Sequence, residues 1–113
     1  MGDERRILCL GDVVGKPGVQ AIRRRLMPWR RDLGVDLVVA NVENACDGSG
    51  LTVTLHGQLR AAGCEVMTNG DHCWRRGEIE RCLREDAATL RPANYMTDSP
   101  GRGWCVVDCR GLR

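Results

Sequence analysis

The sequence is poor in aromatic residues and in lysine, and both shortages narrow the range of possible partners. Its 113 residues include no phenylalanine, three tryptophans and one tyrosine, which is too few rings for the stacking platform of a single-strand nucleic-acid binder. Lys16 is the single lysine among 17 basic residues, and the net charge of +2 indicates no strong polyelectrolyte partner. The arginines at 23–25 and 30–31 are interpreted as a solvated helix face, with phosphate or nucleic-acid contact as the alternative.

Further absences exclude other classes of protein. There is no 18-residue apolar run and no apolar signal region, so we expect a cytoplasmic protein without a membrane partner. The seven cysteines are odd in number and include no CxxC pair, which argues against a disulfide framework and against structural zinc. Cys9, Cys64 and Cys105 lie in or beside apolar runs and are expected to be small buried hydrophobes.

Strand-like and helix-like segments alternate along the chain. Short apolar runs predict strands at residues 7–10, 35–40, 65–68 and 104–109. Three segments with helical spacing separate these runs, so the sequence predicts an α/β fold with alternating β-α units, a mainly parallel sheet and helices on its faces. The length fits a single domain.

Proline, glycine and threonine residues set the expected limits of the helices. The first helix opens at Pro17 and closes at Gly34 as a C-terminal cap. Pro28 lies inside it and predicts a kink or a break near Met27. Thr52 is the expected N-cap of the second helix, which ends at Gly63. The third helix, at about 78–85, is expected to bury Ile79, Cys82 and Leu83.

The turns after the first three predicted strands carry residues that bind metals. Asp12 follows the first strand, Glu43 and Asn44 follow the second, and Asp71 and His72 follow the third. Because the carboxyl ends of strands in an open α/β sheet face one crevice, we expect these side chains to converge there. Hard oxygen ligands with one imidazole suit divalent cations.

Some of these residues also have a purely structural interpretation, which is harder to find for Glu43 and Asn44. Asp12 could form a turn or cap a helix, and His72 could be a hydrogen-bonded loop residue, while His56 on the second helix is interpreted as a surface residue. The glycines near Asp12 do not form GxGxxG, and there is no GK[ST], which disfavours a nucleotide-binding Rossmann-like domain. The presence of metal-ligating residue types after three successive strands favours the functional interpretation over the structural one. Two cations bridged by a carboxylate, with an imidazole to protonate the leaving oxygen, would hydrolyse a phosphoester.

Four runs in order carry a resemblance to a known family: LGDVVGKPG (10–18), VENACDGSGL (42–51), TNGDHCW (68–74) and LRPAN (90–94). At these residues the sequence resembles the bacterial calcineurin-like metallophosphoesterases of the YmdB type. The resemblance implies the N-terminal half of a metallophosphoesterase α/β sandwich. It also implies a two-metal phosphodiesterase that acts on cyclic nucleotides, notably 2′,3′-cyclic ones, and on related diesters.

The same resemblance assigns roles to individual residues. It implies that Asp12 binds one metal, that Glu43 bridges both and that Asn44 completes the coordination. Asp71 stands where the family has asparagine, a ligand of the second metal, so its extra negative charge would tighten the metal and oppose an anionic substrate. His72 would be the proton donor to the leaving group. The implied cofactors are two divalent ions, for which Fe, Mn and Zn are all suitable.

The chain also departs from the family, whose further histidine ligands come from the second half of a longer chain. No histidine follows His72, so residues 1–113 are interpreted as a partial domain, a truncated form expected to bind metal weakly and to show little or no turnover. The expected partner is a phosphodiester or cyclic nucleotide substrate, with no stable nucleic-acid complex; a homo-oligomer is compatible with the sequence. The alternative is a non-catalytic metal- or nucleotide-binding regulatory module.

Overall fold

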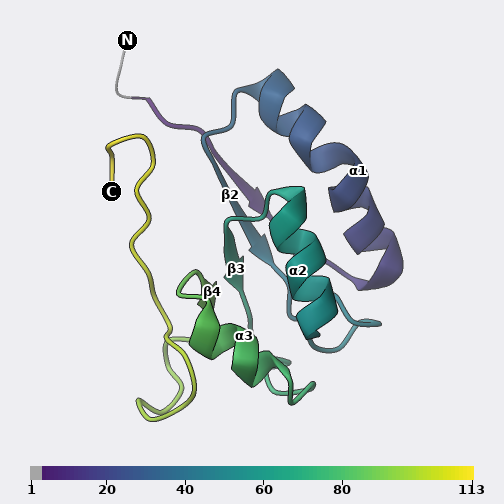
Figure 1. The fold of residues 1–113 in the computed structure, drawn as a ribbon, viewed down its shortest axis with the longest axis vertical. Helices are drawn as coiled ribbons and strands as arrows, with labels where there is room; N and C mark the ends of the chain where they lie inside the picture. The colour runs from purple at the N-terminus through teal and green to yellow at the C-terminus, as the bar shows by residue number, and fades with distance from the viewer. Residues whose placement is uncertain (1–3) are drawn as a thin grey trace.

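A computed structural model describes residues 4–113, and strands and helices alternate in it from Ile7 to Leu90 (Figure 1). The elements are β1 (Ile7–Leu10), α1 (Gly15–Leu33), β2 (Leu37–Asn41), α2 (Val53–Ala62), β3 (Val66–Thr68), α3 (Ile79–Glu85) and β4 (Thr89–Leu90). Among these described residues, no helix is both long enough and apolar enough to cross a membrane.

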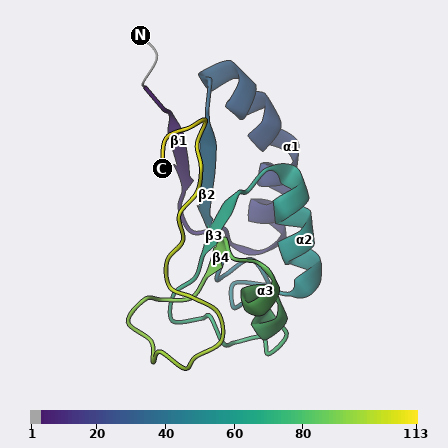
Figure 2. The same cartoon turned by 60° about the vertical axis from the view of Figure 1, so that its left-hand side comes forward.

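All four strands are parallel and pair in chain order, β1-β2-β3-β4. This arrangement confirms the predicted α/β fold with a parallel sheet. The three helices all cover the same face of this sheet (Figure 2). Each crossover advances in the same direction across the sheet, and crossovers of one hand then place every helix on one side.

The core lies between the sheet and its helical layer. Val38, Ala40 and Met67 point into it from the strands and are fully buried, as is Leu26 of α1. The opposite face of β1 is open, so Ile7 is 55% exposed. The cysteines follow this division: Cys64 is buried as predicted, but Cys9 is exposed on the open face of β1 and Cys105 is only half-buried.

The predicted C-terminal ends of α1 and α2 are confirmed, whereas α1 begins at Gly15, two residues before the predicted start, and the predicted break is absent. Gly34 and Gly63 adopt left-handed backbone angles, with φ of 63° and 115°, after α1 and α2. The Thr52 hydroxyl accepts the backbone N–H of Leu55 at 3.2 Å, as an N-cap does. Helix α1 continues through Pro28 to Leu33. Burial of its apolar face against the sheet offsets the hydrogen bond that proline cannot donate.

The fourth strand is not where the sequence predicts it. Residues Thr89–Leu90 pair with β3, whereas residues 104–109 form no strand and only Cys109 makes an isolated bridge, to Leu112. The C-terminal segment instead runs back along the sheet towards the start of β1 (Figure 2). There the Arg5 guanidinium donates to the Cys109 carbonyl at 3.0 Å. Thr89–Leu90 follows α3 closely in the chain and occupies the edge of β3.

His56 is not the surface residue that its helical position suggested, because its side chain is only 16% exposed. Its Nε2 lies 3.0 Å from Asp86 Oδ2 and 2.8 Å from Thr89 Oγ1. Burial alone would raise the pKa of Asp86, but hydrogen bonds from Thr89 and from the backbone of Ala88, with the Arg60 guanidinium, lower it to about 2. This polar cluster ties α2 to the start of β4.

Candidate metal and catalytic site

Backbone hydrogen bonds bring the three ligand-bearing loops together at the carboxyl edge of the sheet. The N–H of Val13 donates to the Asn41 carbonyl at 3.1 Å, and the N–H of Val42 donates to the Thr68 carbonyl at 2.9 Å. The N–H of Gly15 adds a bond of 3.1 Å to the Asn44 carbonyl. The strand register therefore continues for one or two residues past the strands, and this fixes where the loops begin.

Three of the five predicted site residues form a compact group. One ligand atom from each of Glu43, Asp71 and His72 lies within 4.8 Å of the other two. Glu43 is held from two sides: its Oε2 accepts the backbone N–H of His72 at 3.0 Å, and its Oε1 accepts Nδ2 of Asn41 at 3.3 Å. The Asp71 side chain is 90% exposed, so the group opens to solvent.

Asp12 and Asn44 join this group through side-chain hydrogen bonds. Nδ2 of Asn44 donates to Oδ1 of Asp12 at 2.8 Å, and Oδ1 of Asn44 bonds Nδ1 of His72. Because this amide oxygen can only accept, Nδ1 of His72 carries the proton in this hydrogen bond. Nε2 of His72 then faces Oδ2 of Asp71 at 3.9 Å. All five residues thus belong to one connected network, with Asp12 at its far end.

The donor set fits a divalent cation. It offers carboxylates from Asp12, Glu43 and Asp71, the amide oxygen of Asn44 and the imidazole of His72. Oxygen ligands with an imidazole are the chemistry that Mn, Fe and Zn accept in proteins. Since Oδ1 of Asn44 is already bonded to His72, ligation by Asn44 would exchange that bond for the metal.

Gly70 leaves the space that the Glu43 carboxylate occupies. A Cβ on Gly70 would lie 2.3 Å from Oε1 and 2.7 Å from Oε2 of Glu43. No side chain fits at this position without displacing the carboxylate. The requirement for glycine in the TNGDHCW run is therefore steric.

Two aromatic residues beside the site were missed by sequence reasoning. The Tyr95 hydroxyl donates to the Gly70 carbonyl at 3.2 Å, and its ring stacks on Trp74 with centroids 6.1 Å apart. Burial raises the pKa of Tyr95, and the charges of nearby groups that include Asp71 and Glu43 add to this. The available signals were the position of Trp74 two residues after His72 and that of Tyr95 directly after the LRPAN run.

The LRPAN run contacts the segment that leads into the Asp71–His72 loop. Arg91 is 8% exposed and Asn69 is 9% exposed, and Nδ2 of Asn69 donates to the Leu90 carbonyl at 3.0 Å. Burial raises the pKa of the Cys73 thiol to about 11, with Glu43 raising it further and Arg91 opposing. The buried Arg91 guanidinium and the Glu43 carboxylate therefore both lie close enough to the Cys73 thiol to shift its pKa.

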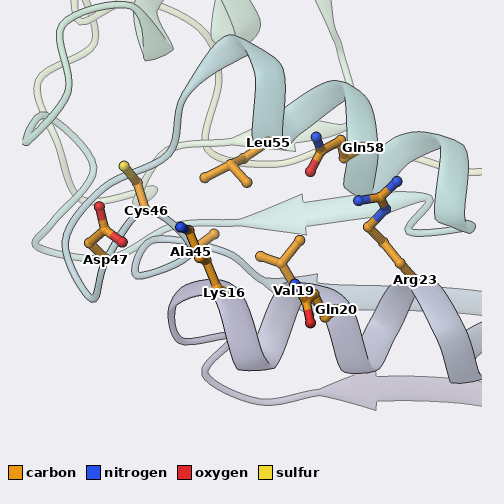
Figure 3. Close-up of a pocket in the computed structure, with 9 residues that line it drawn as sticks. All are labelled: Lys16, Val19, Gln20, Arg23, Ala45, Cys46, Asp47, Leu55 and Gln58. Carbon is orange, nitrogen blue, oxygen red and sulfur yellow. The ribbon is translucent and has the colours of Figure 1, made fainter.

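A separate cavity of about 310 Å³ opens between α1 and α2 (Figure 3). Its walls come from both helices and from the loop after β2. The lining residues are Lys16, Val19, Gln20, Arg23, Ala45, Cys46, Asp47, Leu55 and Gln58. None of the five site residues lines this cavity. The candidate site is therefore separate from it, and it lies at the carboxyl edge of the sheet, open to solvent.

Comparison with known proteins identifies the family. The model of the YmdB-like protein family matches residues 8–113. The chain belongs to the YmdB-like family. Its sequence is 33% identical over 106 residues to a 2′,3′-cyclic-nucleotide 2′-phosphodiesterase of Bacillus subtilis, an alignment that covers 94% of this chain and 40% of the relative.

Two solved structures resemble this YmdB-like chain. A hypothetical protein from Thermus thermophilus superposes with a TM-score of 0.85 and 37% identity, over 94% of this chain and 41% of that one. A structure described as a novel phosphatase from Mycoplasma pneumoniae gives 0.83 and 29%, over 91% and 38%. The chain therefore spans about two fifths of the length of the relatives that it matches.

Proposed function

We propose that this YmdB-like chain belongs to a metal-dependent phosphodiesterase that hydrolyses cyclic nucleotides of the 2′,3′ type or related diesters. The observation that carries the proposal is the meeting of Glu43, Asp71 and His72 within 4.8 Å at one edge of the sheet. The name of the Bacillus subtilis relative supports the reaction class. Two cations at such a site can activate water and stabilise the charge that develops on a phosphoryl group.

Four residues would hold two divalent cations. Glu43 would bridge them, with Asp12 and Asn44 on one side and Asp71 on the other; Fe, Mn and Zn all suit this set. When bound, the cations would supply positive charge at the phosphoryl oxygens and a water of lowered pKa. The protein itself orients Glu43 with the donors from Asn41 and His72, so the carboxylate is fixed before a cation arrives.

His72 would act as the proton donor to the departing oxygen. Its Nδ1 is bonded to Asn44 until ligation exchanges that bond for a cation, and its Nε2 lies on the open side of the site. An imidazole nitrogen on that side can transfer a proton to a departing oxygen. Oδ2 of Asp71 lies 3.9 Å from this Nε2.

Hydrolysis of adenosine 2′,3′-cyclic monophosphate with added Mn²⁺ tests the proposal. The assay should use both this chain and the longest open reading frame that contains it. Glu43→Gln and His72→Ala should each nearly abolish turnover, and His72→Asn, which can still donate to Asn44, should not restore it. Glu85→Gln is the matched control, since its exposed pair with Arg81 contributes little. Wild-type turnover in both site variants would show that the assigned roles are wrong.

The alternative function is a metal- or nucleotide-binding regulatory module without catalysis. The openness of the site favours it, because Asp71 is 90% exposed and water reaches the group freely. Saturable Mn²⁺ binding that is lost in Glu43→Gln, without hydrolysis in any form that contains the chain, would select this alternative. The domain assignment, a cytoplasmic location and a homo-oligomer remain predictions.

A further inference from the structure

Two of the four aromatic residues lie together although the chain separates them by 21 positions. Trp74 follows the His72 loop and Tyr95 follows the LRPAN run, and their rings stack at 6.1 Å with an interplanar angle of 27°. Trp74 is 40% exposed, so the stack keeps an accessible aromatic surface. A low number of aromatic residues argues against an extended stacking platform, but it does not exclude a single local one.

Short contacts connect this stack to the site. The Tyr95 hydroxyl reaches the Gly70 carbonyl at 3.2 Å. Gly70 in turn lies so close to Glu43 that an added Cβ would be 2.3 Å from its Oε1. The stacked pair is therefore in contact with Gly70, and Gly70 is in contact with the Glu43 carboxylate of the ligand group.

We propose that Trp74, held in place by Tyr95, is a stacking subsite for the nucleobase of a nucleotide substrate. The inference rests on the proposed function and specifies its substrate class as base-bearing phosphodiesters. A base offers a flat π-face to any exposed aromatic ring, which suits a site that accepts several bases. Tyr95 limits the orientations of the indole before the ligand arrives, and this lowers the ordering cost of binding.

Binding can be tested without turnover by tryptophan fluorescence. The double variant Trp29→Phe, Trp104→Phe leaves Trp74 as the single tryptophan. Adenosine monophosphate should quench its emission in a saturable way, whereas ribose 5-phosphate and inorganic phosphate should not. Absence of quenching by the base-bearing probe overturns the inference, and so does equal quenching by all three probes.

Substitution of Trp74 gives a second, independent readout. Trp74→Ala should weaken binding of adenosine monophosphate by about 5- to 30-fold, the worth of one stacked base at a partly exposed ring, and leave ribose 5-phosphate binding unchanged. Trp74→Phe should restore part of the loss. The matched control is Trp29→Ala, because Trp29 is also 40% exposed but lies near the far end of α1. An equal loss for both ligands would indicate a structural role and overturn the inference.

Two further measurements keep the inference testable and separate it from the proposed function. If Trp74→Ala fails to fold, the Trp74→Phe and Trp74→Leu variants are compared instead. The subsite is overturned if Trp74→Phe binds adenosine monophosphate no better than Trp74→Leu. In a form that turns over, Trp74→Ala should raise KM for the cyclic nucleotide and leave hydrolysis of the base-free ribose 2,3-cyclic phosphate unchanged. Selective base binding without hydrolysis by any form that contains the chain would sustain the subsite and refute the phosphodiesterase.

Discussion

The substitution Gly70→Ala isolates the placement of the Glu43 carboxylate from its chemistry. It adds one methyl group that would lie 2.3 Å from Oε1 and 2.8 Å from Cδ of Glu43. Ordinary contacts begin at 3.4 Å, so the carboxylate must retreat by about 1.1 Å. The backbone of Gly70 does not lie in the left-handed region, so alanine adds no conformational strain there.

The retreat should weaken metal binding without unfolding the protein. The hydrogen bonds from His72 and Asn41 to Glu43, at 3.0 and 3.3 Å, cannot both survive a shift of that size. Loss of such supporting contacts lowers metal affinity by about 10- to 100-fold in characterised sites. A displacement of about 1 Å can also lower turnover by about 100-fold.

Isothermal titration of the metal-free protein with Mn²⁺ measures the effect, with a thermal melt to confirm folding. Gly11→Ala is the matched control, because it is the same substitution next to Asp12 and its added methyl group meets nothing within 4 Å. If Gly70→Ala bound Mn²⁺ as tightly as the unaltered chain, the position of Glu43 would not control the metal. The steric reasoning would then be refuted.

Three further substitutions test separate parts of the structure. Asp71→Asn removes one negative charge from the site, so Mn²⁺ affinity should fall in titration calorimetry and KM for an anionic diester should fall as well; unchanged values of both would refute a ligand role. The pKa of Asp86 in the folded state is about 2, below its ordinary 3.8, so this carboxylate stabilises the fold above pH 3.8 and loses that effect as the pH falls towards 2. Asp86→Asn should therefore lower Tm at neutral pH and flatten its acid limb between about pH 4 and 2, and an unaltered acid limb would contradict the linkage. Thr52→Ala should cost about 1 kcal/mol in urea denaturation because the cap on Leu55 is lost, whereas Thr54→Ala, exposed on the same helix, should cost less.

Local signals in the sequence predicted most of the elements. The limits of β1 and the caps at Gly34, Thr52 and Gly63 depend on residues within a few positions, and the structure confirms them. The meeting of the ligand-bearing turns was also predictable, since it follows from the geometry of parallel strands. Their catalytic roles remain predictions.

The wrong or missed predictions concern residues whose structure depends on segments that are distant in the sequence. Residues 104–109 have a strand-like composition, but Thr89–Leu90 already occupies the edge beside β3. His56 has the helical position of a surface residue, yet β4 brings Thr89 within 2.8 Å of it. The stacking of Tyr95 on Trp74 likewise depends on tertiary contacts that no short window of sequence records.

The strands lie in the sheet in the same order as in the chain, and this order has a consequence for biosynthesis. Each strand adds to the edge left by its predecessor, so the sheet can grow in the direction in which the ribosome delivers it. The ligand-bearing turns would then assemble in sequence, and the brace from Tyr95 to Gly70 would arrive last. We therefore expect a nascent chain that stops short of Tyr95 to hold its strands but to leave the Asp71–His72 loop unsecured.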